Sequence, residues 1–300
     1  MRIAITGSTG MIGSKLISFF LAGGHQVVQI TRQSAVSNAQ TPIITWDPAR
    51  GQMDVSQLEG FDVIIHLAGV NVGERWDGAY KQSILDSRVQ GTRLLCQTIA
   101  QLKCKPKVLL SASAIGFYGN HAPDIVLDEQ SALGEGFLPQ VCRQWEEETR
   151  PAKDAGVRVV NMRIGVVLSK SGGALAKMWM PFQLGLGGVL GSGLQVMSWI
   201  AIEEIPLIID HLIKHEEISG AVNLVSPQTV SNAQFTQVLG RVIKRPTIFP
   251  VPAIAVRLLF GEMGQALLLE GAHVVPNVLQ QSGYQFKYQD LESALTTVIK

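Results

Sequence analysis

Short apolar runs alternate with longer amphipathic stretches through the first half of the chain. The short runs are rich in valine and isoleucine, whereas the longer stretches repeat apolar residues at the three- and four-residue spacing of a helix. The runs predict strands at Arg2–Thr6, Gln26–Thr31, Pro42–Trp46, Val63–His66, Lys107–Ser111 and Arg158–Arg163. The stretches predict helices near Met11–Ala22, Tyr80–Gln101 and Leu138–Ala155. Strands that alternate with helices form parallel sheets covered on both faces, so this pattern indicates an α/β fold.

The pattern becomes less regular after Val167, where glycines surround an apolar helix and a loop follows. Beyond that point we expect strands at Gln195–Ile200 and Ala221–Leu224, and helices near Glu203–Lys214, Asn232–Ile243, Ala253–Phe260 and Asp290–Ile299. The change predicts a first domain over residues 1–167, whose core also receives later segments, and a smaller C-terminal α/β domain over residues 168–300.

The composition is that of a globular chain with nearly balanced charge. Its 300 residues are enough to bury a core, and 25 Lys and Arg against 24 Asp and Glu give a formal net charge of +1. No long run of one charge occurs, so the sequence gives no sign of a nucleic-acid or anionic-membrane surface. We expect a small-molecule partner and leave homodimer formation open.

Cysteine usage and the start of the chain bear on location. Cys96, Cys104 and Cys142 lack the spacing of metal-binding motifs, which indicates a reducing compartment and no metal site. A strand is predicted directly after Met1, which leaves no room for a signal peptide. No apolar run approaches the roughly 20 residues that span a bilayer. These features predict a cytoplasmic protein.

The segment that follows the first predicted strand reads "TGSTGMIG", with glycines at positions 7, 10 and 13. Gly7 permits a tight exit from the strand, Gly10 lets the backbone approach a pyrophosphate, and Gly13 lets the helix pack close to the sheet. The helix that begins at Met11 then directs its N–H groups and its dipole at the phosphates. An ordinary tight turn would use glycines in the same way, but the strand, spacing and helix together predict a dinucleotide-binding, Rossmann-type doubly wound parallel sheet.

The end of the second predicted strand, "ITRQS", indicates which dinucleotide binds. An acidic residue at this place would contact the ribose 2′-hydroxyl of NAD, whereas Arg32, with Ser34 nearby, suits the 2′-phosphate of NADP. A solvated surface cation is the alternative for Arg32. Because no Asp or Glu lies between Gly24 and Trp46, we expect NADP, in its reduced form NADPH, as the cofactor.

Several motifs together resemble the extended short-chain dehydrogenase/reductases, which include the NAD-dependent epimerase/dehydratase family. The general resemblance rests on "TGSTGMIG", "VIIHLAG" at 63–69 and "SASAIGFYG" at 111–119. Further segments are similar to the YfcH-like epimerase-family branch, with its small C-terminal domain at about 249–297: "ILDSRVQGTRLL" at 84–95, "CRQWEEE" at 142–148, "RIGVVLSKSGGAL" at 163–175 and "LGGVLGSGLQVMSWIAIEE" at 186–204. The resemblance covers essentially the whole chain.

The resemblance implies a set of cofactor contacts. Arg32 would meet the adenosine phosphate, and Arg88 would reach the cofactor from a helix beside it, unless it is a solvated helix cation. The pyrophosphate would be lined by Gly7, Ser8, Thr9, Gly10, Met11 and Ile12, with Gly13 behind them. The path from the adenine ribose toward the nicotinamide would follow Leu67, Ala68 and Gly69.

The same family normally carries Tyr-x-x-x-Lys on the helix after the fifth strand. The corresponding stretch here, "FLPQVCRQWEEETR", contains neither residue, and Cys142, Arg143 or Gln144 stands where the Lys belongs. Ser113 occupies the place of the polarising hydroxyl, unless it caps a turn, and Tyr118 is the nearest phenol and the candidate proton donor, unless it packs in the wall of the crevice.

Other side chains near this helix have alternatives of their own. Arg143 would act as a fixed charge. Cys142 would be a nucleophile only if its pKa were depressed, and is otherwise expected to be a buried, inert thiol. Glu146 would be an acid/base or part of a solvated face. Substrate contacts are expected from segments of the second domain that contain Lys177, Gln195, Ser198 and Trp199, although Trp199 also suits the core.

Two functions therefore remain open. The first is an NADP-dependent oxidoreductase or epimerase-like enzyme, an isomerase in the latter case, whose substrate the sequence does not identify; nucleotide and sugar compounds are candidates. The second, competing hypothesis is a non-catalytic NADP(H)-binding sensor or assembly factor, which the absence of the Tyr and Lys makes credible.

Overall fold

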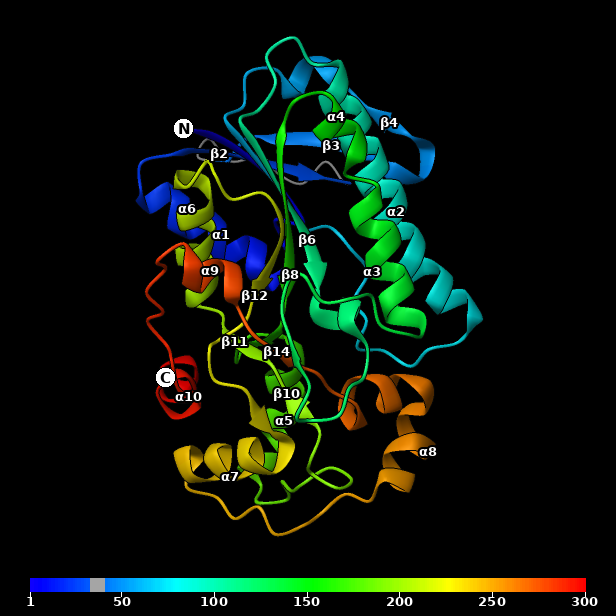
Figure 1. Cartoon of the computed structure of the whole chain (residues 1–300), viewed down its shortest axis with the longest axis vertical. Helices are drawn as coiled ribbons and strands as arrows, with labels where there is room; N and C mark the ends of the chain where they lie inside the picture. Colours follow the sequence, from blue (N-terminus) through cyan, green and yellow to red (C-terminus); the bar gives the residue numbers. More distant parts are fainter. Residues whose placement is uncertain (33–40) are drawn as a thin grey trace.

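An eight-stranded sheet runs through the centre of the computed structural model, which describes residues 1–32 and 41–300 (Figure 1). Its strand order is β12-β8-β6-β5-β1-β2-β3-β4. The strands are β1 Arg2–Thr6, β2 Gln26–Thr31, β3 Ile43–Asp47, β4 Gln52–Met53, β5 Val63–His66, β6 Val108–Ala114, β8 Arg158–Ile164 and β12 Gly220–Leu224. All neighbours pair in parallel except β4, which pairs antiparallel with β3. The expected Rossmann-type parallel sheet is confirmed.

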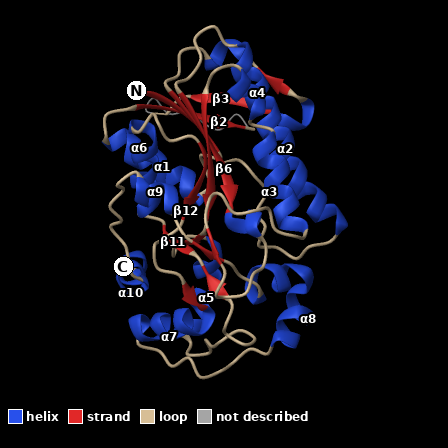
Figure 2. Cartoon of the chain, in the orientation of Figure 1, coloured by secondary structure: helices blue, strands red, loops and turns tan. Residues whose placement is uncertain are grey.

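Helices cover both faces of this sheet, as Figure 2 shows by colour. One face carries α1 Met11–Ala22 and α6 Glu204–Lys214, and the other carries α2 Gly78–Gln101, α3 Phe137–Glu147 and α4 Arg150–Asp154. The remaining helices are α5 Gly173–Gln183, α7 Asn232–Ile243, α8 Ala253–Gly264, α9 Asn277–Gln281 and α10 Leu291–Ile299. No helix among the described residues is long and apolar enough to cross a membrane.

The alternation of side chains along β1 explains the two cores. Ile3 and Ile5 point to one face, where they join Leu16 and Phe20 of α1 in a fully buried cluster. Ala4, between them, points to the opposite face and joins a second cluster with Leu95 of α2. Because successive residues of a strand face opposite sides, a strand buried on both sides must be apolar throughout.

The strand order places a switch point beside β1. The chain proceeds from β1 to β2 and β3 on one side, then returns to β5 on the other side of β1. The helices that follow β1 and β5 consequently cover opposite faces of the sheet. Ligands of open α/β sheets bind at such a point.

Two predicted elements are divided in the structure. The helix predicted at Leu138–Ala155 is broken into α3 and α4, because Pro151 has no N–H to continue the helical hydrogen bonds. The strand predicted at Gln195–Ile200 is two short strands, β10 Val196–Met197 and β11 Trp199–Ala201. They pair with different partners, β13 Val230–Ser231 and β9 Val166–Leu168, so no single strand forms.

The later part of the chain is built onto the first. β12 completes the main sheet against β8, and the cluster around Ile3 also contains residues of α6 and α10. A short parallel pair, β7 Val126–Leu127 with β14 His273–Val274, adds a further connection.

Candidate functional site

The turn after β1 requires glycine at two places because the backbone is crowded there. Gly7 has a φ of 65°, and a side chain at this position would come within 2.8 Å of the Leu67 carbonyl carbon. At Gly13 a Cβ would lie only 2.3 Å from the Gly7 oxygen. The turn, the start of α1 and the end of β5 are thereby held in contact.

The backbone N–H groups at the amino terminus of α1 are not capped by a side chain. Gly10 is the N-cap residue and has no side chain, so the first-turn N–H groups of Met11 and Ile12 are directed outward. Gly10 itself is exposed, and the Ser8 hydroxyl beside it is buried without a partner. This set of donors fits an anion such as a pyrophosphate, which the helix dipole also favours.

A buried chain of hydrogen bonds fixes the end of β5 against this turn. Thr6 Oγ1 accepts the N–H groups of Leu67 and Ala68 at 3.0 and 3.2 Å, so its own hydrogen is donated to His66 Nδ1 at 2.7 Å. The proton of the imidazole therefore lies on Nε2, which donates to Thr92 Oγ1 at 3.0 Å. Burial lowers the pKa of His66 to about 4, and the ring is neutral.

Sequence reasoning missed this role of His66. The signal available was a polar residue at the end of an otherwise apolar strand, facing a Thr at the end of the strand beside it.

Arg32 lies at the carboxyl end of β2, where the adenosine end of a dinucleotide is expected. Its side chain is exposed and makes no hydrogen bond or ion pair with another described residue. Ser34, expected beside it, lies outside the described residues.

Arg88 lies against the carboxyl end of β5. Its Nη1 atom donates to the carbonyl oxygens of Val70 and Ile84 at 3.0 and 3.1 Å, and its guanidinium carbon lies 4.9 Å from the centre of the Trp145 ring. A Cβ at Gly69 would be 3.3 Å from the same carbon. Burial lowers the pKa of Arg88 from its ordinary value. Arg88 is thus largely packed against protein, which argues against the alternative of a solvated helix cation.

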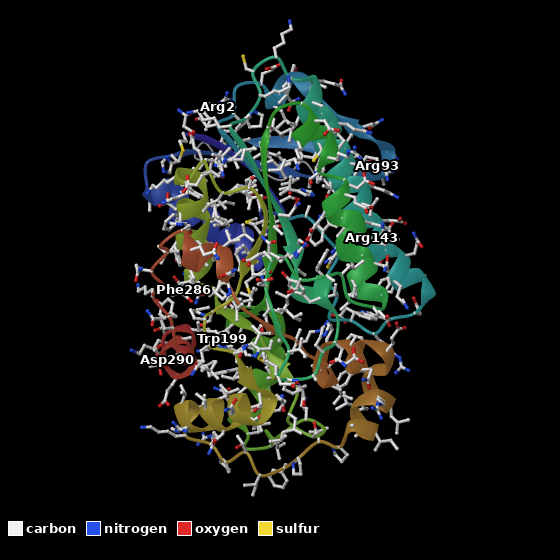
Figure 3. All side chains as sticks on the ribbon, viewed as in Figure 1. Arg2, Arg93, Arg143, Trp199, Phe286 and Asp290 are labelled. Atoms are coloured by element: carbon white, nitrogen blue, oxygen red, sulfur yellow. The ribbon has the colours of Figure 1, made fainter. Side chains whose placement is uncertain are left out.

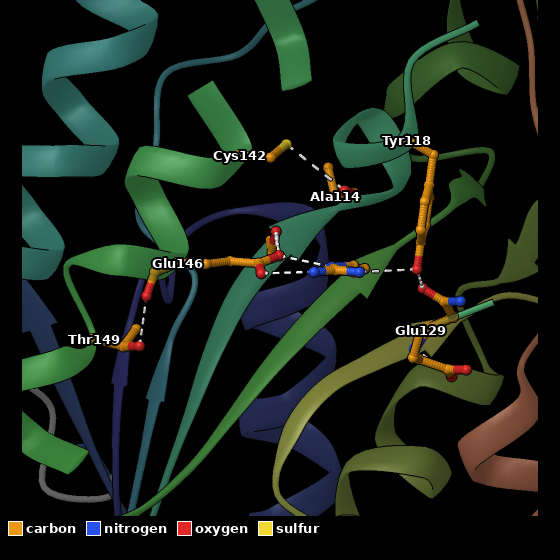
Figure 4. A network of polar contacts seen from close by, with 9 residues as sticks. Ala114, Tyr118, Glu129, Cys142, Glu146 and Thr149 are labelled. Atoms are coloured by element: carbon orange, nitrogen blue, oxygen red, sulfur yellow. Dashed lines mark hydrogen bonds and ion pairs between the residues drawn. The ribbon is translucent and has the colours of Figure 1, made fainter. Parts of the chain in front are cut away.

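Three polar residues form one row across neighbouring strands. Ser113 of β6 is opposite Arg163 of β8, which is opposite Asn223 of β12. Glu146 of α3 joins them: it accepts from Ser113 Oγ at 2.6 Å and forms two bonds with the Arg163 guanidinium, at 2.8 and 2.9 Å (Figure 4). The side chains of Glu146 and Arg163 are only 13% and 6% exposed, so the expectation of a solvated face is wrong for Glu146.

Tyr118 is connected to the same network and is fully buried. Its hydroxyl donates to Asn223 Oδ1 at 2.7 Å and accepts from Arg163 at 3.0 Å. Burial raises the pKa of Tyr118. The hydroxyl hydrogen of Tyr118 is already donated to Asn223 within the protein. The arrangement therefore fits a packed aromatic residue better than a proton donor.

The other candidates on α3 do not form a proton relay. Arg143 lies on the outer face of the helix, 44% exposed, and pairs with Glu147 (Figure 3). Its expected action as a fixed charge at the site is therefore not supported. Cys142 Sγ contacts the Ala114 oxygen at 3.6 Å, and burial raises the pKa of its thiol to about 12. Cys142 is a protonated, packed thiol.

Two of the residues expected to contact substrate have structural roles. Ser198 donates to the Ala272 oxygen and accepts the Val274 N–H, which fixes the C-terminal segment, and Trp199 is completely buried (Figure 3). Lys177 bonds to Glu74 at 3.0 Å, in the loop that follows β5.

Gln195 donates its amide N–H groups to the carbonyl oxygens of Leu190 and Leu268, which joins two loops.

Among the described residues, no group of three or more His, Cys, Asp and Glu side chains is arranged to hold a metal ion.

Comparison with known families and proteins accords with this geometry. The model of the NAD dependent epimerase/dehydratase family matches residues 3–224, and a domain of unknown function, DUF1731, matches residues 251–298. The chain is 42% identical over 294 residues to an epimerase family protein of Mycobacterium bovis, Mb2239, and the match covers 98% of this chain and 96% of the relative. It is 36% identical to the Staphylococcus saprophyticus epimerase family protein SSP1921, over 98% of each chain.

Solved structures show the same similarity. The human epimerase family protein SDR39U1, crystallised with NADPH, superposes with a TM-score of 0.89 at 31% identity and covers 99% of both chains. A nucleoside-diphosphate sugar epimerase from Corynebacterium glutamicum has a TM-score of 0.80 at 34% identity; the match covers 98% of this chain and 57% of that one.

Proposed function

Because the chain belongs to the NAD dependent epimerase/dehydratase family, we propose that it is an NADP(H)-dependent oxidoreductase or epimerase-like enzyme acting on a small molecule. The observation that carries the proposal is the junction of β1, α1 and β5. There, outward-facing N–H groups lie beside two crowded glycines and the unpartnered Ser8 hydroxyl. A nicotinamide dinucleotide bound there would supply hydride transfer.

The residues proposed to hold the cofactor follow the path described above. Residues 7–13 would enclose the pyrophosphate, Leu67, Ala68 and Gly69 would adjoin the ribose, and Arg88 would lie at the nicotinamide end. Arg32 is exposed and free of a described partner, which suits a 2′-phosphate and supports NADP over NAD. The NADPH in the human SDR39U1 structure supports the same preference.

Ser113 is proposed to orient the substrate oxygen. Its hydrogen is donated to Glu146, so toward a substrate it would act as a hydrogen-bond acceptor. A hydroxyl group is therefore a better match than a carbonyl oxygen. Tyr118 would serve as proton donor only if its bond to Asn223 were given up.

A non-catalytic NADP(H)-binding protein is the second candidate. The sequence of α3 contains neither Tyr nor Lys, and its Arg143 points away from the sheet. If no other side chain at the site acts as an acid or base in place of the missing Tyr and Lys, the protein would bind the cofactor without turnover.

Fluorescence titration with NADPH and a turnover assay with carbonyl compounds and sugar nucleotides separate the two candidates. We expect saturable NADPH binding and turnover of one substrate class, seen either as a net change between NADPH and NADP⁺ or as an isomerised product without net cofactor consumption. The rate should be lowered by Ser113→Ala and unchanged by the exposed control Ser18→Ala. Binding without turnover of any compound would favour the second candidate, and absence of binding would contradict both.

A further inference from the structure

Arg88 has a free edge at the candidate site. Both hydrogens of Nη1 are accounted for by the Val70 and Ile84 carbonyl oxygens. The remaining donors, on Nε and Nη2, have no acceptor in the part of the chain that the structure describes, and neither atom is sealed from solvent. One side of the guanidinium is thus fixed by the backbone, and the donors on the other side are unpaired and in partial contact with solvent.

The charge of Arg88 is also uncompensated. No carboxylate of the described residues forms an ion pair with it, and the acidic side chains beside it are the Cys142 thiol and the Tyr80 phenol. Burial raises the pKa of Cys142 to about 12, so the thiol contributes no charge at neutral pH. Enclosing a cation without a partner is costly, and the cost is offset when an anion binds.

The position of Arg88 gives this cation a place in the proposed reaction. Its guanidinium lies against Gly69, the last of the residues assigned to the cofactor path, and above the Trp145 ring of α3. It is also a neighbour of Cys142, one of the positions at which the family resemblance expects the missing Lys. A guanidinium keeps its positive charge at working pH, so Arg88 would bind negative charge without acting as an acid or base.

We propose that the Nε and Nη2 edge of Arg88 binds a carboxylate of the substrate beside the nicotinamide end of the cofactor path. The inference rests on the proposed function, which assigns the anionic groups of the cofactor to the α1 terminus and Arg32. Two parallel N–H groups match the two oxygens of a carboxylate, and the phosphates of the cofactor are already assigned to other residues.

Benzoate, benzamide and inorganic phosphate are suitable probes, because benzamide has the shape of benzoate without its charge. Binding to the full-length protein is measured by calorimetry with and without NADPH, and the NMR signal of the Arg88 Nε–H group is followed in the wild type. We expect saturable benzoate binding, a shifted Arg88 signal, and no binding of benzamide. Arg88→Gln should weaken benzoate at least about tenfold, and Arg88→Lys should recover only part of the loss.

Arg93→Gln is the matched control, since Arg93 lies on the same helix but is 50% exposed and paired with Glu148. It should leave benzoate binding unchanged. Loss of NADPH affinity in Arg88→Gln without any benzoate binding by the wild type would assign the edge to the cofactor and overturn the inference. Equal binding of benzoate and benzamide, or tighter binding of phosphate, would overturn it as well. Failure of the wild type to bind NADPH would contradict the proposed function. The comparison of benzoate with benzamide tests only the role of Arg88, so the two failures are distinguishable.

Discussion

Ser113 and Arg163 are opposite each other on adjacent parallel strands, and both bond to the same oxygen of Glu146, at 2.6 and 2.8 Å. The shared carboxylate joins α3 to the carboxyl ends of β6 and β8. Helix position and strand register are therefore fixed by one buried ion pair at the edge where ligands of such sheets bind.

Replacing Glu146 by Gln should lower the free energy of unfolding by about 3–5 kcal/mol, because it leaves the Arg163 cation enclosed without its partner. Urea unfolding followed by circular dichroism measures the change. Glu147→Gln is the control: its exposed pair with Arg143 contributes roughly 1 kcal/mol or less. Equal effects of the two substitutions would show that the buried pair does not join helix and sheet as described.

Tyr118→Phe should lower the free energy of unfolding by about 1–3 kcal/mol, since Asn223 Oδ1 and Arg163 Nη1 each lose a buried partner. NADPH affinity should stay unchanged, because the hydroxyl faces the interior. An unaltered unfolding curve combined with abolished turnover would contradict this structural role and favour the proton-donor role.

The neutral state of His66 should make the protein less stable in acid. Its folded-state pKa of about 4 lies below the unfolded value, so its contribution is present above pH 6.5 and is lost as the pH falls toward 4. Lowering the pH from 7 to 5 should therefore decrease the free energy of unfolding by about 2 kcal/mol through His66. Urea midpoints measured at both pH values for the wild type and His66→Gln check it. A similar pH dependence in the variant would exclude His66 as the cause.

Gly10→Ala should separate cofactor binding from folding. Its Cβ would meet only the Gly7 oxygen, at 3.2 Å, so unfolding should change by about 1 kcal/mol or less. The same methyl group would occupy the exposed side of the turn and weaken NADPH at least about tenfold. Gly13→Ala, with a Cβ 2.3 Å from the Gly7 oxygen, should instead lower stability markedly. Undiminished NADPH affinity in Gly10→Ala would place the cofactor elsewhere.

Arg32→Ala should lower the ratio of NADPH to NADH affinity by about tenfold or more, since a charge-assisted contact to the 2′-phosphate is removed. Parallel fluorescence titrations with both cofactors measure the ratio. NADH affinity serves as the internal control and should be nearly constant. An unchanged ratio would mean that the 2′-position is recognised by other residues.

The sheet and its first helix could be predicted from the sequence because their signals are local. Apolar runs fixed β1, β2 and β5 at their observed bounds, and the glycine spacing fixed the start of α1. The break between α3 and α4 at Thr149 could have been predicted from Pro151, which interrupts the helical hydrogen bonds. The division of the strand predicted at Gln195–Ile200 could not, because it depends on pairing with β9 and β13, which are distant in sequence.

The contacts of the site were less predictable, since they depend on the register between distant strands. Glu146 and Glu147 are neighbours in sequence, yet one is buried against Arg163 and the other is exposed with Arg143. The open edge of Arg88 depends on the path of the loop at Gly69 and Val70, where the backbone supplies carbonyl acceptors that a sequence does not display.

The pairing of β12 with β8 has a consequence for how the chain folds. Residues 220–224 complete the sheet only after more than fifty residues of intervening chain have been placed, counted from the end of β8 at Ile164. Until then β8 is an edge strand with unpaired backbone groups, the kind of surface at which chains associate wrongly. A fragment that stops near Val167 would retain that edge permanently, so the two parts should be produced together, as one cooperative unit in which β12 covers the exposed edge of β8.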